Sequence, residues 1–152
     1  RFQVRGTIHN ITVVDDYGHH PTEIRATLAA ARNCDFENIH VIFQPHRHSR
    51  TAALFGELAA CFEDCDRLCV VDIYGAGEKA IEGVNALRLT EKIQATGHPS
   101  AIYCPSMESA CAVVTKAARP GDVIIALGAG SIWQASEQLF LLLTEESDGE
   151  QS

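Results

Sequence analysis

Short, almost continuous apolar runs alternate along the chain with segments whose apolar residues recur about every 3.6 positions. The apolar runs are rich in β-branched residues, which is typical of strands buried on both faces of a sheet. We predict such strands at residues 11–15, 40–43, 68–72, 100–103 and 122–127. Helices are expected after Pro21, Ser49, Ser106 and Ser131, with a weaker one at residues 86–95. The alternation predicts an α/β fold: a Rossmann-like three-layer sandwich with a mostly parallel sheet and helices on both faces.

The two ends of the chain depart from this pattern. Residues 2–8 alternate apolar and polar side chains, so we expect an edge strand that pairs with residues 11–15, or a linker. The sequence begins with Arg1 rather than Met, and we therefore expect it to be part of a longer protein. Residues 144–152 are acidic and polar, and are expected to fray.

Composition indicates one globular domain and limits its partners. Of 152 residues, 46% are hydrophobic and 21% are charged, so the chain can bury its own core. The formal net charge of −8 argues against nucleic acid or an anionic membrane as partner, because both require a basic surface. No run approaches the roughly 20 apolar residues of a membrane-spanning helix. No secretory signal is visible either, and we expect a cytoplasmic protein.

Six cysteines raise the question of a disulfide or metal framework. No two of them form a C-x-x-C pair, and a chain of this composition can fold without cross-links. We therefore expect buried free thiols. The alternative is a zinc or redox site at Cys61, Cys65 and Cys69, whose spacing of four would place them on one face of a helix.

Ligands of parallel α/β sheets bind beyond the carboxyl ends of the strands, so the turn after each predicted strand is a candidate site. The first turn, residues 15–23, contains two carboxylates, a phenol and two imidazoles: Asp15, Asp16, Tyr17, His19 and His20. A carboxylate here can hold Mg²⁺ or a ribose hydroxyl, and an imidazole can contact a base or an anion. The density of polar groups predicts function. The alternative is that Asp16 caps the turn and the histidines are solvated.

The second turn, residues 44–51, places Arg47 and Arg50 three positions apart at the start of a predicted helix. Cations are unfavourable at a helix N-terminus, where the free N–H groups attract anions. The guanidinium group matches a carboxylate or phosphate through two parallel hydrogen bonds. We therefore predict that a ligand anion binds at these arginines; a solvated basic first turn is the alternative.

Two glycine-containing turns follow later strands. Residues 72–78 are expected to form either a mobile wall of the site or only a loop. Residues 128–133 lack the third glycine of the dinucleotide-binding G-x-G-x-x-G motif, and a tight turn is expected instead. The sequence contains no G-x-x-x-x-G-K-[ST], so a phosphate-binding loop for ATP is expected outside this domain.

Several of these segments together resemble the C-terminal domain of the Mur ligases. Residues 13–23 and 43–51 carry the resemblance most specifically. Residues 1–2, 72–78 and 128–130 match in the same order, so the resemblance covers nearly the whole chain. It implies a larger enzyme, with an N-terminal domain for a UDP-sugar and a central ATPase domain before this one.

The resemblance also implies a domain organisation and a reaction. Residues 1–8 would be a hinge or edge strand from the missing central domain, residues 9–143 the domain itself, and residues 144–152 a frayed tail. The reaction would be ATP-driven amide formation, in which the lactyl carboxylate of UDP-N-acetylmuramate becomes an acyl phosphate and the amine of L-alanine attacks it. ATP and Mg²⁺ would be bound mainly by the central domain, and this domain alone would be inactive.

Roles for single residues near the nucleotide follow from the same resemblance. Arg1 would contact the nucleotide from the hinge. Asp16 would bind the ribose of ATP or organise that region. Tyr17 and His19 would line the junction between the nucleotide and the amino acid.

The resemblance assigns Arg47 and Arg50 to the carboxylate of alanine, in agreement with the anion predicted above. Together with His19 they are the candidate catalytic residues, and no metal ligand is expected in this domain. A non-catalytic α/β module that binds a small carboxylate or phosphate through Arg47 and Arg50 is the alternative function.

Overall fold

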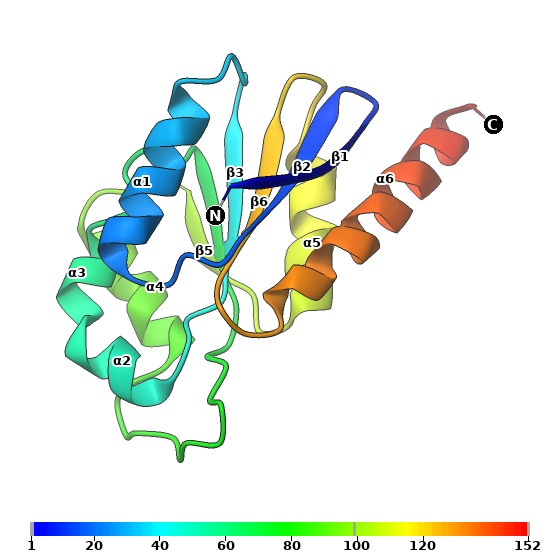
Figure 1. Ribbon diagram of the computed structural model, residues 1–152. Coiled ribbons are helices and arrows are strands. Elements are labelled where there is room, and N and C mark those ends of the chain that lie inside the picture. The colour runs from blue at the N-terminus through cyan, green and yellow to red at the C-terminus, as the bar shows by residue number, and fades with distance from the viewer. Residues whose placement is uncertain (1, 99, 152) are drawn as a thin grey trace.

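A computed structural model describes residues 2–98 and 100–151. Six strands form one sheet in the order β1-β2-β6-β3-β4-β5 (Figure 1). The strands are β1 (Gln3–Ile8), β2 (Ile11–Asp16), β3 (Ile39–Phe43), β4 (Arg67–Val70), β5 (Ala101–Tyr103) and β6 (Val123–Leu127). The helices are α1 (Pro21–Arg32), α2 (His48–Ala53), α3 (Phe55–Ala59), α4 (Ala86–Ala95), α5 (Met107–Ala117), the short 3-10 helix η1 (Ile132–Gln134) and α6 (Ala135–Gln151). Only β1 is antiparallel to its neighbour, so the predicted mostly parallel sheet is confirmed.

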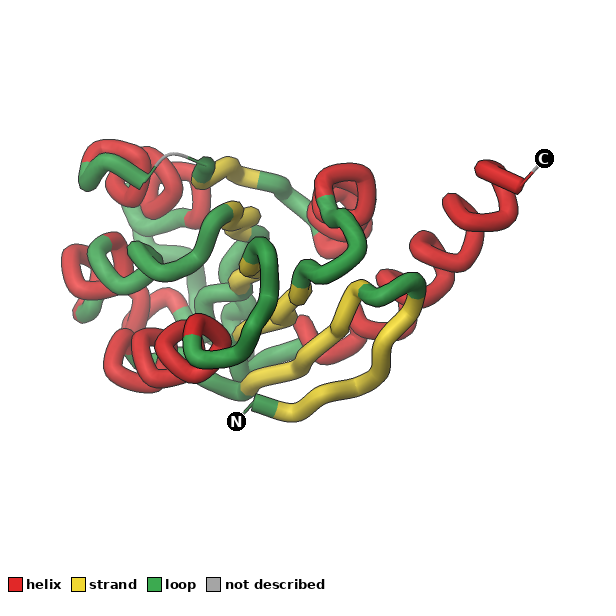
Figure 2. The backbone as a smooth tube through the Cα atoms, turned by 90° about the horizontal axis from the view of Figure 1, so that it is seen from above, coloured by secondary structure: helices red, strands yellow, loops and turns green. Residues whose placement is uncertain are grey.

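Helices cover both faces of the sheet and give the domain its three layers (Figure 2). α1, α3 and α4 pack on one face, and α5 and α6 pack on the other (Figure 1). β6 lies between β2 and β3, although it is the last strand in the sequence. As a result, the turns that follow β2, β6 and β3 are neighbours at the carboxyl ends of these strands.

Burial on both faces explains why the central strands read as continuous apolar runs. Every residue of β3 and β6 is buried. On the α1 side of the sheet, the rings of Phe43 and Phe62 lie 5.0 Å apart within the core. Burying one side chain of this size contributes about 1.5–3 kcal/mol, so these apolar clusters provide the main stabilisation of the fold.

The N-terminal segment forms the edge strand that its alternation predicts. β1 pairs with β2 through a turn at His9 and Asn10, which both have positive φ. Arg5 on β1 forms an ion pair with Asp15 on β2 (3.5 Å). Asp15 also accepts a hydrogen bond from the Ser136 hydroxyl of α6. Burial raises the pKa of Asp15, and its contacts join β1, β2 and α6.

Three local predictions differ from the structure. The helix expected after Ser49 is interrupted at Leu54 (φ −112°, ψ 17°), so that two short helices, α2 and α3, take its place. The strand predicted at residues 68–72 ends at Val70. The strand predicted at residues 100–103 begins at Ala101. Residues 144–151 continue α6, and their fraying stays a prediction.

A buried hydrogen bond between His40 and Asp122 holds the amino ends of β3 and β6 together. His40 and Asp122 are each 1% exposed, and His40 Nε2 lies 2.9 Å from Asp122 Oδ2. Asp122 also accepts hydrogen bonds from Asn38 Nδ2 (3.2 Å) and the Arg119 N–H (2.9 Å). Burial alone would raise the pKa of Asp122, but these hydrogen bonds, with that of His40 first, lower it below its usual value.

Five of the six cysteines are buried as predicted, and Cys34 is exposed. Burial raises the pKa of Cys61, Cys65 and Cys111 to about 12, so these thiols are protonated and unreactive at neutral pH. Cys61 and Cys65 lie on one face of the sheet and Cys69 on the other, which does not fit the alternative of a shared zinc site. No helix in the described part of the chain is long and apolar enough to cross a membrane.

Candidate functional site

The carboxyl ends of four strands lie side by side at the bottom of the sheet in Figure 1, and the turns that follow them carry the predicted site residues. These are the turns after β2, β6, β3 and β4. The insertion of β6 between β2 and β3 brings the turn with His19 next to the turn with Arg47 and Arg50. The structure therefore assembles in one place the segments that the sequence analysis singled out separately.

The turn after β2 is organised by the buried carboxylate of Asp16. This side chain is 3% exposed; its Oδ1 accepts a hydrogen bond from the Gly18 N–H (2.7 Å), and its Oδ2 accepts one from the Thr27 hydroxyl on α1 (2.8 Å). Both oxygens are thus engaged within the domain. Of the two roles expected for Asp16, the geometry favours organising the turn over binding the ribose directly.

His20 caps α1, whereas Asp16 caps the preceding turn through Gly18, as the alternative interpretation of this turn proposed. Its Nδ1 accepts a hydrogen bond from the Thr22 N–H (3.2 Å), and Glu23 Oε1 accepts one from the His20 N–H (3.0 Å), which completes a capping box. The backbone hydrogen bond from His20 lowers the pKa of Glu23 despite partial burial. Tyr17 (61% exposed) and the half-buried His19 precede this capping box, in the turn at the carboxyl end of β2.

The turn after β3 contains a linked group of cationic and imidazole side chains. Arg50 Nη1 donates a hydrogen bond to His46 Nδ1 (3.0 Å). The ring of His46 lies 5.9 Å from the ring of His19, so the turns after β2 and β3 meet at this pair. Neither Arg47 nor Arg50 lies within ion-pair distance of a carboxylate among residues 2–98 and 100–151. Two guanidinium groups that lack a carboxylate within ion-pair distance are suited to bind an anion.

His46 is a neutral imidazole in this arrangement. An arginine can only donate, so the Nδ1 that faces Arg50 is an acceptor and the proton is on Nε2. Burial, followed by the charge of Arg50, lowers the pKa of His46 below its usual value. His46 can therefore orient Arg50 through Nδ1 and donate a hydrogen bond to a ligand through Nε2. His46 lies in the turn that was predicted to bind an anion, but the sequence pattern indicated no role for it.

The free N–H groups at the start of α2, one of the reasons for predicting a ligand anion, already have a partner within the protein. α2 has six residues, and Arg47 before it has φ 70° and ψ 139° with no side-chain cap. Glu78, from the loop after β4, instead accepts hydrogen bonds from the Ser49 N–H (3.0 Å) and Ser49 Oγ (2.5 Å). The hydrogen bond from the hydroxyl is the main cause of the lowered pKa of Glu78. The carboxylate of Glu78 thus occupies this helix start. The prediction of a ligand anion therefore depends on Arg47 and Arg50, which have no carboxylate within ion-pair distance in the described part of the chain.

The loop after β4 is attached to the turn after β3 and is therefore a fixed wall of the site. Arg47 donates its N–H to the carbonyl of Tyr74 (2.7 Å), and Tyr74 donates its N–H to the carbonyl of Pro45 (2.9 Å). The ring of Tyr74 stacks on the ring of His46, with centroids 5.7 Å apart and planes inclined by 10°.

The glycine turn after β6 packs tightly against the end of β3. A Cβ at Gly128 (φ 151°) would lie 2.7 Å from the carbonyl oxygen of Gln44, so glycine is required there. The Gln44 side chain accepts a hydrogen bond from the Ile132 N–H (3.1 Å) and donates one to Ser131 Oγ (3.1 Å). The tight turn that we predicted in place of a dinucleotide motif agrees with this geometry.

An open cleft of about 700 Å³ lies beside the turn after β2. It is lined by Phe2, Gln3, Asp16, Tyr17, Gly18, Glu23, Ala26 and Thr27. The cleft combines aromatic side chains with the hydroxyl and carboxylate groups of the turn, a composition that suits a nucleoside. Arg1, the residue expected to contact the nucleotide, lies outside the described residues.

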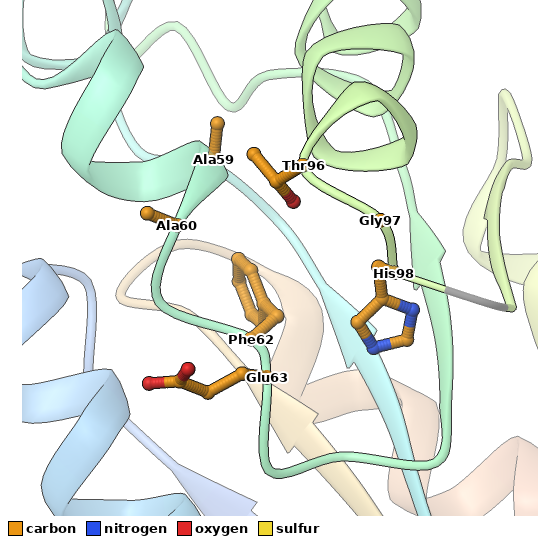
Figure 3. A pocket seen from close by; sticks show the side chains of 7 residues that line it. All are labelled: Ala59, Ala60, Phe62, Glu63, Thr96, Gly97 and His98. Carbon is orange, nitrogen blue, oxygen red and sulfur yellow. The ribbon is translucent and has the colours of Figure 1, made fainter.

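A second cavity, of about 340 Å³, lies away from this edge, between the ends of α3 and α4 (Figure 3). Phe62 and His98 form two of its walls. Both nitrogens of His98 have partners: Nε2 lies 3.0 Å from the Cys65 carbonyl, and Nδ1 accepts the Ser100 N–H (3.2 Å). This histidine therefore connects two loops of the fold, and no role in the candidate site is assigned to it.

Three residues that shape the site carry no motif of their own: His46, Tyr74 and Glu78. Each lies in a turn that the sequence analysis identified, so the position at a strand end was the available signal. Their partners, however, are far away in the sequence: Ser49 and Glu78 are 29 residues apart. Such pairs become visible only when the strands are placed next to one another.

Comparison with known proteins shows a family match over most of the chain. The family described as Mur ligase, glutamate ligase domain, matches residues 1–130. A UDP-N-acetylmuramate–L-alanine ligase from Solibacter usitatus is 50% identical over 149 residues, which are 98% of this chain and 32% of that protein. An enzyme of the same name from Geobacter sulfurreducens is 50% identical over 146 residues, covering 95% of this chain and 32% of that protein. The chain thus spans about a third of the length of these relatives.

Solved structures agree with the fold. The UDP-N-acetylmuramate–alanine ligase of Thermotoga maritima superposes with a TM-score of 0.74 and 25% identity, over 96% of this chain and 30% of that chain. A single domain of a Haemophilus ducreyi protein assigned as a UDP-N-acetylmuramate:L-alanyl-γ-D-glutamyl-meso-diaminopimelate ligase gives a TM-score of 0.70 and 26% identity. That match covers 94% of this chain and 99% of that one, so a domain with these limits has been crystallised by itself.

Proposed function

The chain belongs to the Mur ligase family, as its glutamate ligase domain, and on that premise we propose that it is the C-terminal domain of an ATP-dependent ligase that joins L-alanine to UDP-N-acetylmuramate. The relatives that are 50% identical over nearly the whole chain carry that substrate pair in their names. The observation that carries the proposal is that Arg47 and Arg50 have no carboxylate within ion-pair distance among the described residues. Arg50 is held by His46, whose ring lies near that of His19 at the carboxyl ends of the strands.

In the proposed reaction, ATP phosphorylates the lactyl carboxylate of UDP-N-acetylmuramate, and the amine of alanine displaces the phosphate. The incoming amino acid must present its amine while its own carboxylate is kept away from the phosphoryl group. Arg47 and Arg50 would bind that carboxylate, because the guanidinium group offers paired donors to it. Fixing one end of alanine orients the amine, which lowers the entropic part of the barrier.

Tyr17 and His19 are proposed to line the junction between alanine and the nucleotide, because they come from the turn that borders both the arginine pair and the cleft beside Phe2. We assign the nucleoside to that cleft, with Arg1 as an expected contact and Asp16 holding the turn in place. Mg²⁺ is assigned to the proposed central domain, as the family resemblance implies. A cytoplasmic location fits the proposed substrates.

Alanine-dependent release of ADP by the full-length protein that contains this chain tests the proposal. With UDP-N-acetylmuramate and ATP present, we expect L-alanine to support release better than a panel of larger amino acids. Arg50→Ala should raise the KM for alanine about 10–100-fold, because a charge-assisted hydrogen bond contributes about 1.5–3 kcal/mol. The KM for ATP should change little.

Arg67→Ala is the matched control, since Arg67 is an exposed arginine at the opposite end of β4. It should leave the KM for alanine unchanged. An Arg50→Ala enzyme with wild-type KM for alanine would contradict the carboxylate assignment. A wild-type protein that releases no ADP with any amino acid would contradict the ligase itself.

A further inference from the structure

Tyr74 lies where the turns after β3, β4 and β6 come together. Its backbone bridges to the turn after β3 through the two hydrogen bonds with Pro45 and Arg47. Tyr74 is 40% exposed. The backbone contacts do not depend on the side chain, so the role of the ring can be considered separately.

On one side the ring of Tyr74 stacks on His46, and His46 in turn accepts the hydrogen bond from Arg50. The near-parallel stack, inclined by only 10°, opposes tilting of the imidazole plane about the Cβ–Cγ bond of His46. Rotation would carry Nδ1 away from the guanidinium of Arg50. The plane of the Tyr74 ring therefore sets the direction in which Arg50 is held.

The ring also contacts the glycine turn after β6. A Cβ at Gly130 would lie 2.5 Å from Tyr74 Cγ and 2.7 Å from Cδ1, closer than side-chain atoms approach one another. It would also lie 2.8 Å from Gln44 Oε1. The glycine at position 130 thus makes room for this ring, which gives the turn after β6 a function that its incomplete motif did not reveal.

We propose that Tyr74 is a positioning residue for the carboxylate-binding site: its ring, in contact with Gly130, fixes His46 and through it Arg50. The inference rests on the proposed function and deepens it, since it names a residue that governs affinity for the amino acid without touching it. Tyr74 contacts neither guanidinium through its side chain in the described contacts; its influence passes through the imidazole.

The kinetic experiment uses the full-length enzyme with Tyr74→Leu, which keeps an apolar side chain and removes the planar ring. The KM for alanine should rise about tenfold, which corresponds to about 1.4 kcal/mol, while the KM values for ATP and UDP-N-acetylmuramate stay within about twofold. Tyr74→Phe keeps the ring and should restore the KM for alanine. A Tyr74→Leu enzyme with wild-type KM for alanine would overturn the proposal.

A double-mutant cycle separates positioning from general damage. In an Arg50→Ala background, Tyr74→Leu should raise the KM for alanine by less than about twofold, because its effect acts through Arg50. A full tenfold increase in that background would refute the route through His46. Should Tyr74→Leu fail to fold, Gly130→Ala displaces the same ring from its other contact, and the same two outcomes apply to it.

Nitrogen-15 spectra of the histidine rings supply a readout that does not require turnover. Wild type should show His46 as the Nε2–H tautomer with a hydrogen-bonded Nδ1, and Tyr74→Leu should show exchange between tautomers. An unchanged His46 signal would overturn the positioning role. If the tautomer responds but the wild-type enzyme releases no ADP with alanine, the proposed function fails and the positioning role stands.

Discussion

The hydrogen bond between Thr27 and Asp16 offers a quantitative test of how the candidate site is held. The Asp16 carboxylate is 3% exposed and Thr27 is 7% exposed, so water cannot easily replace a lost partner. Thr27→Val keeps the shape of the side chain and removes the hydroxyl that donates to Asp16 Oδ2 at 2.8 Å. A hydrogen bond to a charged group contributes about 1.5–3 kcal/mol.

For a domain of 152 residues, 1 kcal/mol corresponds to about 3 °C in Tm. Thermal unfolding of the domain, followed by circular dichroism, should therefore show a decrease of about 5–9 °C for Thr27→Val. Thr22→Val is the control on the same helix, because Thr22 is exposed and valine and threonine have similar helix propensities. Its Tm should stay within about 2 °C of wild type.

Asp16→Ala and the double variant complete the cycle. Asp16→Ala should be the more damaging single change, since it also leaves the Gly18 N–H without its acceptor. In the Asp16→Ala background, Thr27→Val should lower the free energy of unfolding only slightly, which gives a coupling energy of about 1–2 kcal/mol between the two residues. Additive effects, or a Thr27→Val Tm within about 2 °C of wild type, would show that this carboxylate does not hold the turn, and direct ribose binding would become the better interpretation of Asp16.

Two further predictions concern stability and reactivity. The lowered pKa of Asp122 means that its ionised form stabilises the folded state above its unfolded pKa of about 3.9, and that this stabilisation is lost as the pH falls through the lower folded value. Asp122→Asn should therefore lower the free energy of unfolding in urea at pH 7 and flatten its decrease below about pH 4; an identical pH dependence in both proteins would contradict this reasoning. Titration of the folded domain with a thiol reagent should modify Cys34 quickly and the other five cysteines only after denaturation. Fast modification of Cys61 or Cys65, whose pKa burial raises to about 12, would show that the core around them opens readily.

The sheet could be predicted because its signal is local. A strand buried on both faces must be apolar throughout, and β3 and β6 satisfy this rule at every position. The interruption at Leu54 could not be predicted in the same way, because apolar residues continue at helical spacing from α2 into α3. What directs α2 is Glu78, which binds its first turn from a distant loop.

The candidate site, too, could be predicted only in part from local sequence. The turns with His19 and Arg50 could be located, because strand ends collect ligands in this class of fold. The partners of these residues could not, because the dipole argument took the helix start to be free when Glu78 already occupies it. Local sequence thus indicates where the arginines lie, and the tertiary contacts decide what orients them.

The late position of β6 in the sequence has a consequence for how the domain is made. Until Val123–Leu127 leave the ribosome, β2 and β3 have no strand between them, and each presents an open hydrogen-bonding edge. The turn with His19 and the turn with Arg50 meet only after this last strand inserts. A nascent chain that stalls before residue 123 therefore has neither a complete sheet nor an assembled candidate site, and its exposed strand edges can pair with other chains. Binding competence thus arises in a single late step of folding.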